Sequence, residues 1–196
     1  MGRQEDHYTR MARRRGYPAR SVYKLEEIQS RFKLIGRGDR VLDVGATPGS
    51  WSLYLLRECG ARVVAVDIAP LGGTVRADNL LFIRGDVFDD EVADRIRAAG
   101  PYNAVLSDAA PSTTGSRTVD CARSYALVER VLELAPELLE PGGTVVAKVF
   151  QGGGERELLA TIRSSFETAR AFKPRASRKA SFEIYLIGTG FVQKST

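Results

Sequence analysis

The sequence predicts an α/β fold with a mostly parallel seven-stranded sheet, helices on both faces and an antiparallel last strand. One observation is that short apolar, β-branched runs alternate with segments of helical periodicity from residue 40 onward. Strands that alternate with helices pair in parallel and are covered on both faces. A second is size: 196 residues, 43% of them hydrophobic and 27% charged, suit one globular domain. We therefore expect a single domain over residues 1–196, with a basic arm and helix at 1–39 and the α/β core at 40–190.

The N-terminal segment differs from the core. Residues 1–17 are polar and lack an apolar period, so we expect an arm without regular structure. A helix is expected from Ala19 to Phe32, because apolar side chains recur there at helical spacing and Pro18 suits the first turn of a helix.

The elements of the core follow from the same periodicities. Strands are expected at 40–44, 62–66, 80–83, 103–106, 144–150 and 182–188. Helices are expected at 50–59, 89–99, 120–139 and 154–166. Residues 168–174 form a further candidate strand, and the short link that follows predicts an antiparallel final pair.

The composition excludes several chemistries and locations. His7 is the one histidine, so neither a zinc centre nor a Ser-His-Asp triad is expected, and we expect no metal. Cys59 and Cys121 lie far apart and are expected to be buried thiols. No apolar run is long enough to cross a bilayer, and the Arg-rich start is unlike a secretory signal. We expect a cytoplasmic protein without a membrane partner, whose chemistry uses Lys, Asp, Glu, Tyr or a cofactor.

The net charge of +5 is unevenly distributed. Residues 1–40 hold eleven Lys and Arg against five Asp and Glu, whereas the remainder is close to neutral. A second basic cluster, from Arg170 to Lys179, contains no acidic residue. Tyrosines and a phenylalanine interleave these clusters, and aromatic faces stack on unpaired bases. The pattern favours an RNA partner bound through residues 3–40 and 170–180.

The segment from Asp43 to Trp51 follows the first strand of the core and is typical of a nucleotide-type loop. Gly45 and Gly49 let the backbone turn sharply and approach a ligand closely. The loop then opens a helix whose free N–H groups face the crevice beyond the strand. It is not the dinucleotide fingerprint, because Thr47 stands where a second glycine is required.

Acidic residues follow three successive strands of the core. Asp43 suits a ligand with a positive amino group, which it would hold directly or through water. Asp67 ends the next strand, where a carboxylate can accept both hydroxyls of a ribose. Asp86 follows the third strand, where it would bond an adenine amino group. An amino acid head, a ribose and an adenine without phosphate describe S-adenosylmethionine, which we expect as the cofactor.

Four charged residues are candidates for the reaction. Asp108 follows the fourth strand, at the same edge as the cofactor loop. Lys148 lies inside an apolar strand, where a lysine is costly unless it is paired or emerges at the strand end. Glu183 opens the last apolar run, and Lys24 lies on the N-terminal helix.

Several segments in order resemble the RrmJ/FtsJ-type ribosomal RNA 2′-O-methyltransferases. The resemblance covers about residues 7–190 and rests on the segments D-V-G-A-T-P-G-S-W, S-D-A-A-P, A-K-V-F-Q-G and S-F-E-I-Y-L-I, with A-R-S-V-Y-K-L-E-E-I as the opening helix. It implies the Rossmann-like fold of S-adenosylmethionine-dependent methyltransferases. Ser50 and Ala109 depart from a glycine and a methionine common in the family.

The resemblance also implies roles for individual residues. It implies a catalytic tetrad of Lys24, Asp108, Lys148 and Glu183. It implies cofactor contacts at Gly49, Trp51, Asp67, Asp86 and Asp108. From the residues themselves, Asp43 and Gly45 join the cofactor-binding set. Whether Lys148 acts as a general base or as a cation that orients the hydroxyl stays open at this point.

The implied activity is methylation of an RNA ribose 2′-hydroxyl, with a uridine of large-subunit (23S) ribosomal RNA as the expected target. A tRNA or an mRNA cap is the alternative substrate. Two rivals belong to other classes. A nicotinamide-dependent oxidoreductase fits Asp67 but lacks the glycine triplet and leaves the basic clusters unexplained. A non-catalytic RNA-binding ribosome assembly factor is opposed by the presence of all four tetrad residues.

Overall fold

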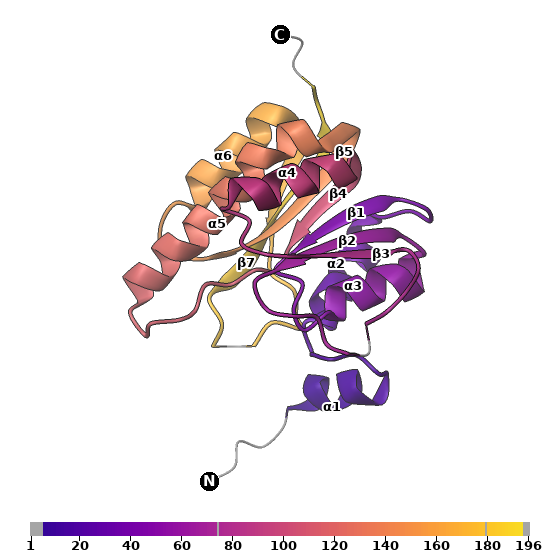
Figure 1. The fold of residues 1–196 in the computed structure, drawn as a ribbon. Helices are drawn as coiled ribbons and strands as arrows, with labels where there is room; N and C mark the ends of the chain where they lie inside the picture. The colour runs from indigo at the N-terminus through magenta and orange to yellow at the C-terminus, as the bar shows by residue number, and fades with distance from the viewer. Residues whose placement is uncertain (1–5, 74, 179, 194–196) are drawn as a thin grey trace.

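The computed structural model describes residues 6–73, 75–178 and 180–193. Within those ranges its centre is a seven-stranded sheet of order β3-β2-β1-β4-β5-β7-β6 (Figure 1). The elements in chain order are α1 (His7–Arg14), α2 (Val22–Phe32), β1 (Arg40–Val44), α3 (Ser50–Tyr54), the π-helix η1 (Leu55–Cys59), β2 (Arg62–Asp67), β3 (Leu80–Arg84), α4 (Asp90–Ala99), β4 (Tyr102–Ser107), α5 (Arg117–Leu138), β5 (Leu139–Phe150), α6 (Glu155–Ser165), β6 (Phe166–Phe172) and β7 (Glu183–Phe191).

Strand direction confirms the predicted sheet. Strands β1 to β5 pair in parallel, and β7 is antiparallel to both of its neighbours, β5 and β6. The candidate strand at 168–174 is β6, which begins two residues earlier at Phe166. The expected helix at 50–59 is confirmed in position but consists of α3 followed by the π-helix η1.

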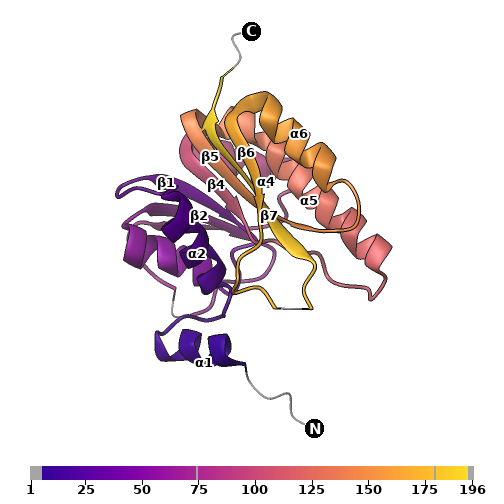
Figure 2. The ribbon, with the colours of Figure 1, turned by 180° about the vertical axis from the view of Figure 1, so that it is seen from behind.

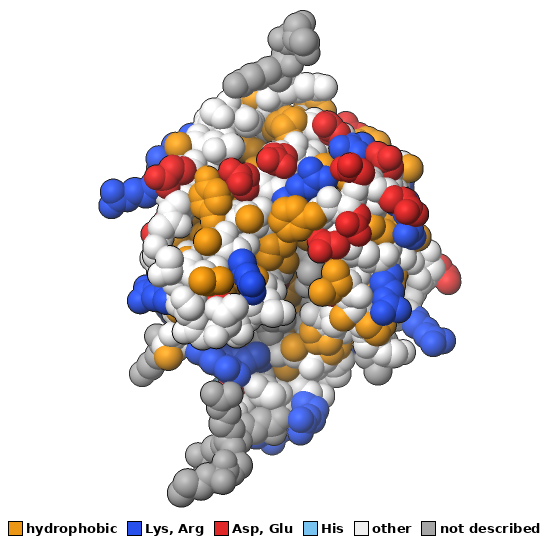
Figure 3. Space-filling model, turned by 60° about the vertical axis from the view of Figure 1, so that its left-hand side comes forward, with side chains coloured by type: hydrophobic (Ala, Val, Ile, Leu, Met, Phe, Trp, Pro, Cys, Tyr) orange, Lys and Arg blue, Asp and Glu red, His pale blue; other side chains and the backbone are white. Residues whose placement is uncertain are grey.

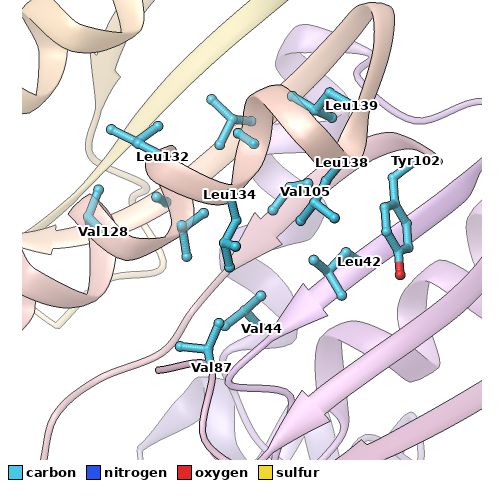
Figure 4. Close-up of a cluster of buried hydrophobic side chains, with 14 of the residues drawn as sticks. Leu42, Val44, Val87, Tyr102, Val105, Val128, Leu132, Leu134, Leu138 and Leu139 are labelled. Carbon is cyan, nitrogen blue, oxygen red and sulfur yellow. The ribbon is translucent and has the colours of Figure 1, made fainter. Parts of the chain in front are cut away.

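Helices cover both faces of the sheet, as predicted. Helices α4, α5 and α6 lie on one face, and α2 and α3 lie on the other (Figures 1 and 2). Strand residues alternate between two apolar cores: Val145 and Ala147 belong to the core under α5, whereas Val146 belongs to the core under α2. Figure 4 shows the first core, where leucines and valines of α5 pack onto β1 and β4.

The N-terminal segment departs from the prediction. Residues 1–17 were expected to lack regular structure, which is wrong for α1. Asp6 caps this helix by accepting a hydrogen bond from the Thr9 N–H at 3.0 Å. Ala12 is buried in the core under α2, and α1 lies outside the sheet layers beside α2 (Figures 1 and 2). Helix α2 begins at Val22, three residues later than expected.

The carboxyl ends of the parallel strands meet at one edge of the sheet. The strand order reverses between β1 and β4, and ligands of open α/β sheets bind in the crevice at such a point. Because β7 is antiparallel, its first residue lies at this same edge, where Glu183 pairs with Phe150 at the end of β5. The fold therefore brings the ends of β1, β2, β4 and β5 and the start of β7 together.

Two composition-based expectations concern cysteines and membranes. Cys59 and Cys121 are free thiols, and Cys121 is buried as expected, whereas Cys59 is only partly buried. No helix formed by the described residues is both long enough and apolar enough to span a bilayer.

Candidate active site

Four charged side chains from distant parts of the chain meet at the carboxyl edge. Lys24 Nζ lies 2.7 Å from Glu183 Oε1 and 3.9 Å from Asp108 Oδ1. Lys148 Nζ lies 3.0 Å from Asp108 Oδ1 and donates to the Asp108 carbonyl oxygen at 2.5 Å. The side chains are 7–14% exposed. The structure thus brings the four sequence-predicted catalytic residues into one cluster, hereafter the tetrad.

Local structure explains why the tetrad converges. Lys148 lies two residues after Val146 on β5, so the two side chains point to the same face of the sheet. Lys148 therefore faces α2 rather than α5. Glu183 lies near the start of the antiparallel neighbour β7, two positions from Tyr185, the residue in register with Lys148. Helix α2 packs on this face through buried apolar residues and carries Lys24 toward the same edge. Two ammonium groups and two carboxylates therefore meet without lying near each other in sequence.

Asp108 is the electrostatic centre of the tetrad. Burial raises the pKa of its carboxyl, but the Lys148 and Lys24 ammonium groups and the Tyr185 hydroxyl outweigh burial and hold the pKa below its ordinary value. Asp108 is therefore an anion at neutral pH, and it holds Lys148 in position through both its carboxylate and its backbone carbonyl.

Two uncharged side chains complete the cluster, and sequence reasoning missed both. The Tyr185 hydroxyl donates to Asp108 Oδ1 at 2.7 Å, and its ring stacks on Trp51 at 5.8 Å. Burial, followed by the charges of Asp108 and Glu183, raises the pKa of Tyr185 well above its ordinary value, so it remains a donor. Ser177 donates to Glu183 Oε1 at 2.8 Å. Strand periodicity was a signal for Tyr185, since it lies two residues after Glu183 and shares its face.

A cavity of about 530 Å³ adjoins the tetrad through Asp108. Its wall is formed by the ends of β1 and β2, by residues that follow β3 and β4, and by part of α5. It includes the predicted cofactor residues Gly45, Asp67, Asp86 and Asp108. Asp67 is held rigidly, because its two oxygens accept from the Thr47 N–H at 2.9 Å and the Ala69 N–H at 2.8 Å. The structure therefore gathers the acids that follow the second, third and fourth strands on one wall.

Exposed apolar side chains line the same cavity and were not predicted. Ile68 is 66% exposed and Phe88 is 48% exposed, although both are large and hydrophobic. They follow Asp67 and Asp86, respectively, within two residues. Apolar walls with a few fixed polar groups are typical of sites for small organic ligands. The sequence carried no signal for these side chains beyond their nearness to the acids.

Three predicted cofactor residues, Asp43, Gly49 and Trp51, do not belong to the cavity wall within the described part of the chain. The Trp51 side chain is buried, and its indole N–H donates to the Ser21 carbonyl oxygen at 2.9 Å. Gly49 has a φ of +104°, and a β-carbon there would lie 2.6 Å from a methyl group of Val75. These residues shape the cofactor loop, and their contact with a ligand stays a prediction.

The loop also approaches the opposite wall closely at Gly45. Its φ is +75°, and an added β-carbon would lie 2.5 Å from the Cα atom of Ala109, next to Asp108. A glycine is therefore needed here both for backbone conformation and for the close approach of two strand ends.

Asp43 lies on β1 directly before the cavity residue Val44 and has no exposed surface. Its Oδ2 accepts from Ser52 Oγ at 2.6 Å, and among the described residues no hydrogen-bond partner reaches its Oδ1. Burial raises the pKa of Asp43 to about 7, since the Ser52 hydrogen bond only partly offsets it and the Asp108 charge adds to it. An unpaired buried oxygen next to the loop is consistent with a polar or charged ligand group held nearby.

We expect this carboxyl to make stability fall with rising pH in the ligand-free protein. Its pKa of about 7 in the folded state lies above the unfolded value of 3.8, so the folded state binds more protons between these limits. The free energy of unfolding should therefore fall by up to about 4 kcal/mol between roughly pH 4 and 7. In Asp43→Asn this contribution should vanish, as measured by urea unfolding at a series of pH values.

Asp78→Asn is the matched control, because Asp78 is exposed and the chemical change is identical. Its urea-unfolding profile shows what the loss of one exposed carboxylate does by itself. A profile for Asp43→Asn that keeps the wild-type slope between these limits would show that Asp43 is not the titrating group.

Metal chemistry was not expected, and among the described residues no group of three or more His, Cys, Asp or Glu side chains is arranged to hold a metal ion.

Comparison with known proteins identifies the family of this chain. Residues 17–191 match the model of the FtsJ-like methyltransferase family. "Ribosomal RNA large subunit methyltransferase E" of Treponema denticola is 50% identical over 188 residues, which cover 95% of this chain and 94% of that protein. The protein of the same name from Borreliella afzelii is 44% identical over 95% of this chain and 98% of its own.

Solved structures show the same fold at low sequence identity. A ribosomal RNA methyltransferase, putative, from Plasmodium falciparum superposes with a TM-score of 0.79 at 23% identity, covering 91% of this chain and 100% of that one. Human methyltransferase-like protein 13 in complex with SAH gives a TM-score of 0.59 at 16% identity, covering 89% and 82%. The family model spans most of the sequence, and the two named relatives match over nearly their whole lengths. This chain therefore belongs to the FtsJ-like methyltransferase family.

Proposed function

We propose that this protein transfers a methyl group from S-adenosylmethionine to a ribose 2′-hydroxyl of large-subunit ribosomal RNA. The observation that carries the proposal is the tetrad, placed at the rim of a ligand cavity of about 530 Å³. Family membership and relatives named for large-subunit ribosomal RNA methylation support it. We also propose that residues 1–196 act as one methyltransferase domain in the cytoplasm, with 1–39 as its N-terminal part and 40–190 as its core.

The cavity suits the chemistry of this cofactor. Asp67 would accept hydrogen bonds from ribose hydroxyls, and Asp86 would accept one from an adenine amino group. Ile68 and Phe88 offer apolar surface for a base plane. Asp108, an anion at neutral pH, supplies negative potential for a positively charged ligand, and such a ligand would favour the ionised form of Asp43. When bound, S-adenosylmethionine supplies a methyl group on a sulfonium, which is electrophilic and needs no metal.

The tetrad then has to orient a hydroxyl and manage its proton. Lys148 Nζ is fixed by Asp108, so it can contact the 2′-oxygen in one orientation. As the oxygen–methyl bond forms and the sulfur–methyl bond breaks, the hydroxyl proton has to leave. Lys148 either accepts that proton, or it stabilises the developing negative charge as an ammonium ion while the proton passes to solvent water. Lys24 and Glu183 form the adjoining ion pair, which keeps a second cation and a second carboxylate beside the reacting groups.

Residues 3–40 and 170–180 are proposed to bind the RNA. Residues 3–5 and Lys179 lie outside the described residues. Elsewhere the two segments are joined by hydrogen bonds: Arg20 Nη2 donates to the Ala176 carbonyl oxygen at 2.5 Å, and Glu27 accepts from the Ala176 N–H at 3.3 Å. Both segments border the tetrad, because Lys24 and Ser177 contact Glu183. Lys and Arg are most of the charged side chains in the lower half of the face in Figure 3.

Not every arginine of this face is available to RNA. Arg15 is paired with Glu26 at 2.9 Å and lies over the Tyr17 ring, so it stabilises the segment itself. Arg14 and Arg175 are exposed and suit phosphate contacts better. We expect Arg14→Ala with Arg175→Ala to weaken RNA binding and to reduce the slope of log K against log salt by roughly 1–2.

The salt dependence is measured by filter binding to ribosomal RNA. The matched control replaces Arg95 and Arg163, which are exposed on α4 and α6 on the other face of the sheet. If both double variants lose affinity equally, net charge rather than this surface governs binding.

Mapping of 2′-O-methyl groups in cells with and without the protein tests the proposed function. We expect one ribose of the large-subunit RNA to lose its methyl group and to regain it when purified protein and S-adenosylmethionine are added to the unmethylated subunits. If a site in tRNA or in an mRNA cap is lost instead, that RNA is the substrate. If no methylated site is lost in any RNA, the proposal is overturned.

A further inference from the structure

We infer that Arg117 and Phe182 form a stacking platform for an unpaired RNA base next to the tetrad. The inference rests on the proposed function and extends the RNA surface beyond residues 3–40 and 170–180. The platform lies on the side of the tetrad that faces α5, whereas those segments border it on the side of α2.

Phe182 is fixed beside the reaction site. It directly precedes Glu183, and its carbonyl oxygen accepts from the Gln151 N–H at 2.8 Å. Its ring packs on Phe150 with a centroid distance of 4.7 Å. Phe150 ends β5 two residues after Lys148, so the aromatic pair lies at the carboxyl edge of the sheet, next to two members of the tetrad.

Arg117 lies over the Phe182 ring of this aromatic pair. Its guanidinium carbon is 5.2 Å from the centroid of the Phe182 ring, and Nη2 donates to the Gln151 carbonyl oxygen at 3.3 Å. Within the described ranges no carboxylate lies at ion-pair distance from it, and its side chain is exposed. A guanidinium plane supported by an aromatic ring is oriented but still charged, which suits stacking on a base and contact with a phosphate.

The charges along α5 argue that Arg117 is not placed there for helix stability. A helix macrodipole favours acidic residues at the start and basic residues at the end. Helix α5 has Arg117 and Arg123 beside one acidic residue, Asp120, in its first two turns, whereas its last two turns carry Glu133 and Glu137 and its last turn has no basic residue. The basic end lies toward the tetrad. This reversal is explained if that end meets a polyanion.

The segment that carries Arg117 is held in place before any ligand binds. Asp120 is buried, and its Oδ1 accepts from the Thr114 N–H at 2.7 Å and from the Thr114 hydroxyl at 2.9 Å. This closes the turn that leads into α5. A preformed platform costs little ordering entropy on binding, so stacking there contributes to affinity directly.

The test uses variants of Arg117 and Phe182. For each variant it measures methyl transfer to unmethylated large ribosomal subunits and the affinity of the protein for those subunits. Arg117→Ala should raise KM for the subunit by about tenfold, the value expected from one stacked base, and leave the Kd for S-adenosylmethionine unchanged. Arg117→Lys keeps the charge but loses the planar stack, so it should recover only a minor part of the affinity. Phe182→Leu, which keeps apolar volume, should weaken binding in the same direction.

Arg163→Ala is the matched control. It removes the same charge from the last turn of α6, which lies at the edge of the sheet opposite to the tetrad. At that edge the Val192 N–H donates to the Ser165 carbonyl oxygen. If Arg117→Ala and Arg163→Ala give the same KM, no platform exists. If Arg117→Lys matches the wild type, the residue acts as a charge alone and the stacking proposal is wrong. If the wild type itself transfers no methyl group to RNA, the proposed function fails instead.

Discussion

Replacement of Lys148 by methionine is expected to reduce methyl transfer by a factor of about 10³, within the range found for positioned proton-transfer groups. Methionine fills a similar volume in a side-chain position that is 7% exposed, but it carries no ammonium group. The variant should bind S-adenosylmethionine and RNA within a few-fold of the wild type, because Lys148 does not belong to the cavity wall within the described residues. Single-turnover transfer of labelled methyl, with both ligands saturating, measures the chemical step.

Lys148→Arg separates the two roles left open for this residue. Arginine stays protonated at every pH at which proteins fold, so it can orient an oxygen but cannot accept a proton. An arginine variant that recovers much of the lost rate would assign Lys148 as an orienting cation. A variant as slow as the methionine variant would favour a base. Transfer by Lys148→Met within tenfold of the wild type would remove Lys148 from the mechanism altogether.

Replacement of Asp108 by asparagine is expected to damage stability and activity together. The carboxylate lies 3.0 Å from Lys148 and 3.9 Å from Lys24, and the three side chains are at most 14% exposed. With an amide at position 108, the nearly buried ammonium groups of Lys24 and Lys148 lose one of the two carboxylates beside them. Loss of one partner from a buried ion pair costs about 3 kcal/mol. We expect a loss of roughly that size in the free energy of unfolding, and a fall in turnover of at least about 10².

The pH dependence of this variant has a definite sign. The pKa of Asp108 is below its unfolded value, so the carboxyl contributes stability that is present above about pH 4 and is lost as the pH falls through the folded value. In Asp108→Asn that loss below about pH 4 should be absent, so the wild type and the variant should converge in strong acid.

Asp67→Asn is the control within the same cavity. Asp67 accepts hydrogen bonds from backbone N–H groups and does not contact the tetrad. Its replacement should therefore weaken cofactor binding more than it lowers the free energy of unfolding. Normal turnover by Asp108→Asn at saturating cofactor would show that the tetrad tolerates the loss of its central anion.

Much of the fold could be predicted because its periodicities are local. The parallel order from β1 to β5 follows from strands that alternate with helices, and the antiparallel β7 follows from the short link after β6. The N-terminal arm was mispredicted because α1 spans only His7–Arg14. In so short a helix the apolar period is nearly invisible, and the Asp6 cap and packing on α2 supply the stability.

The candidate site was predicted in its charged members and missed in its uncharged ones. Lys148 was conspicuous because a lysine in an apolar strand has to be paired. Tyr185 carried only the weak signal of strand periodicity, and Ser177 carried none, since a serine in a loop is ordinary. Ile68 and Phe88 were missed because only a tertiary fold decides that an apolar side chain stays exposed on a cavity wall.

By itself, the sequence predicted the alternation of strands and helices in the core, the acids at the strand ends and the basic segments, and its resemblance to a family implied the four tetrad residues. Only the tertiary structure decided that Lys24 and Glu183 lie 2.7 Å apart although 159 positions separate them, and that Asp108 is the common neighbour of both lysines. The physical reason is that periodicity is set within a few residues. Ion pairs depend on which face of the sheet α2 covers and on the direction of β7.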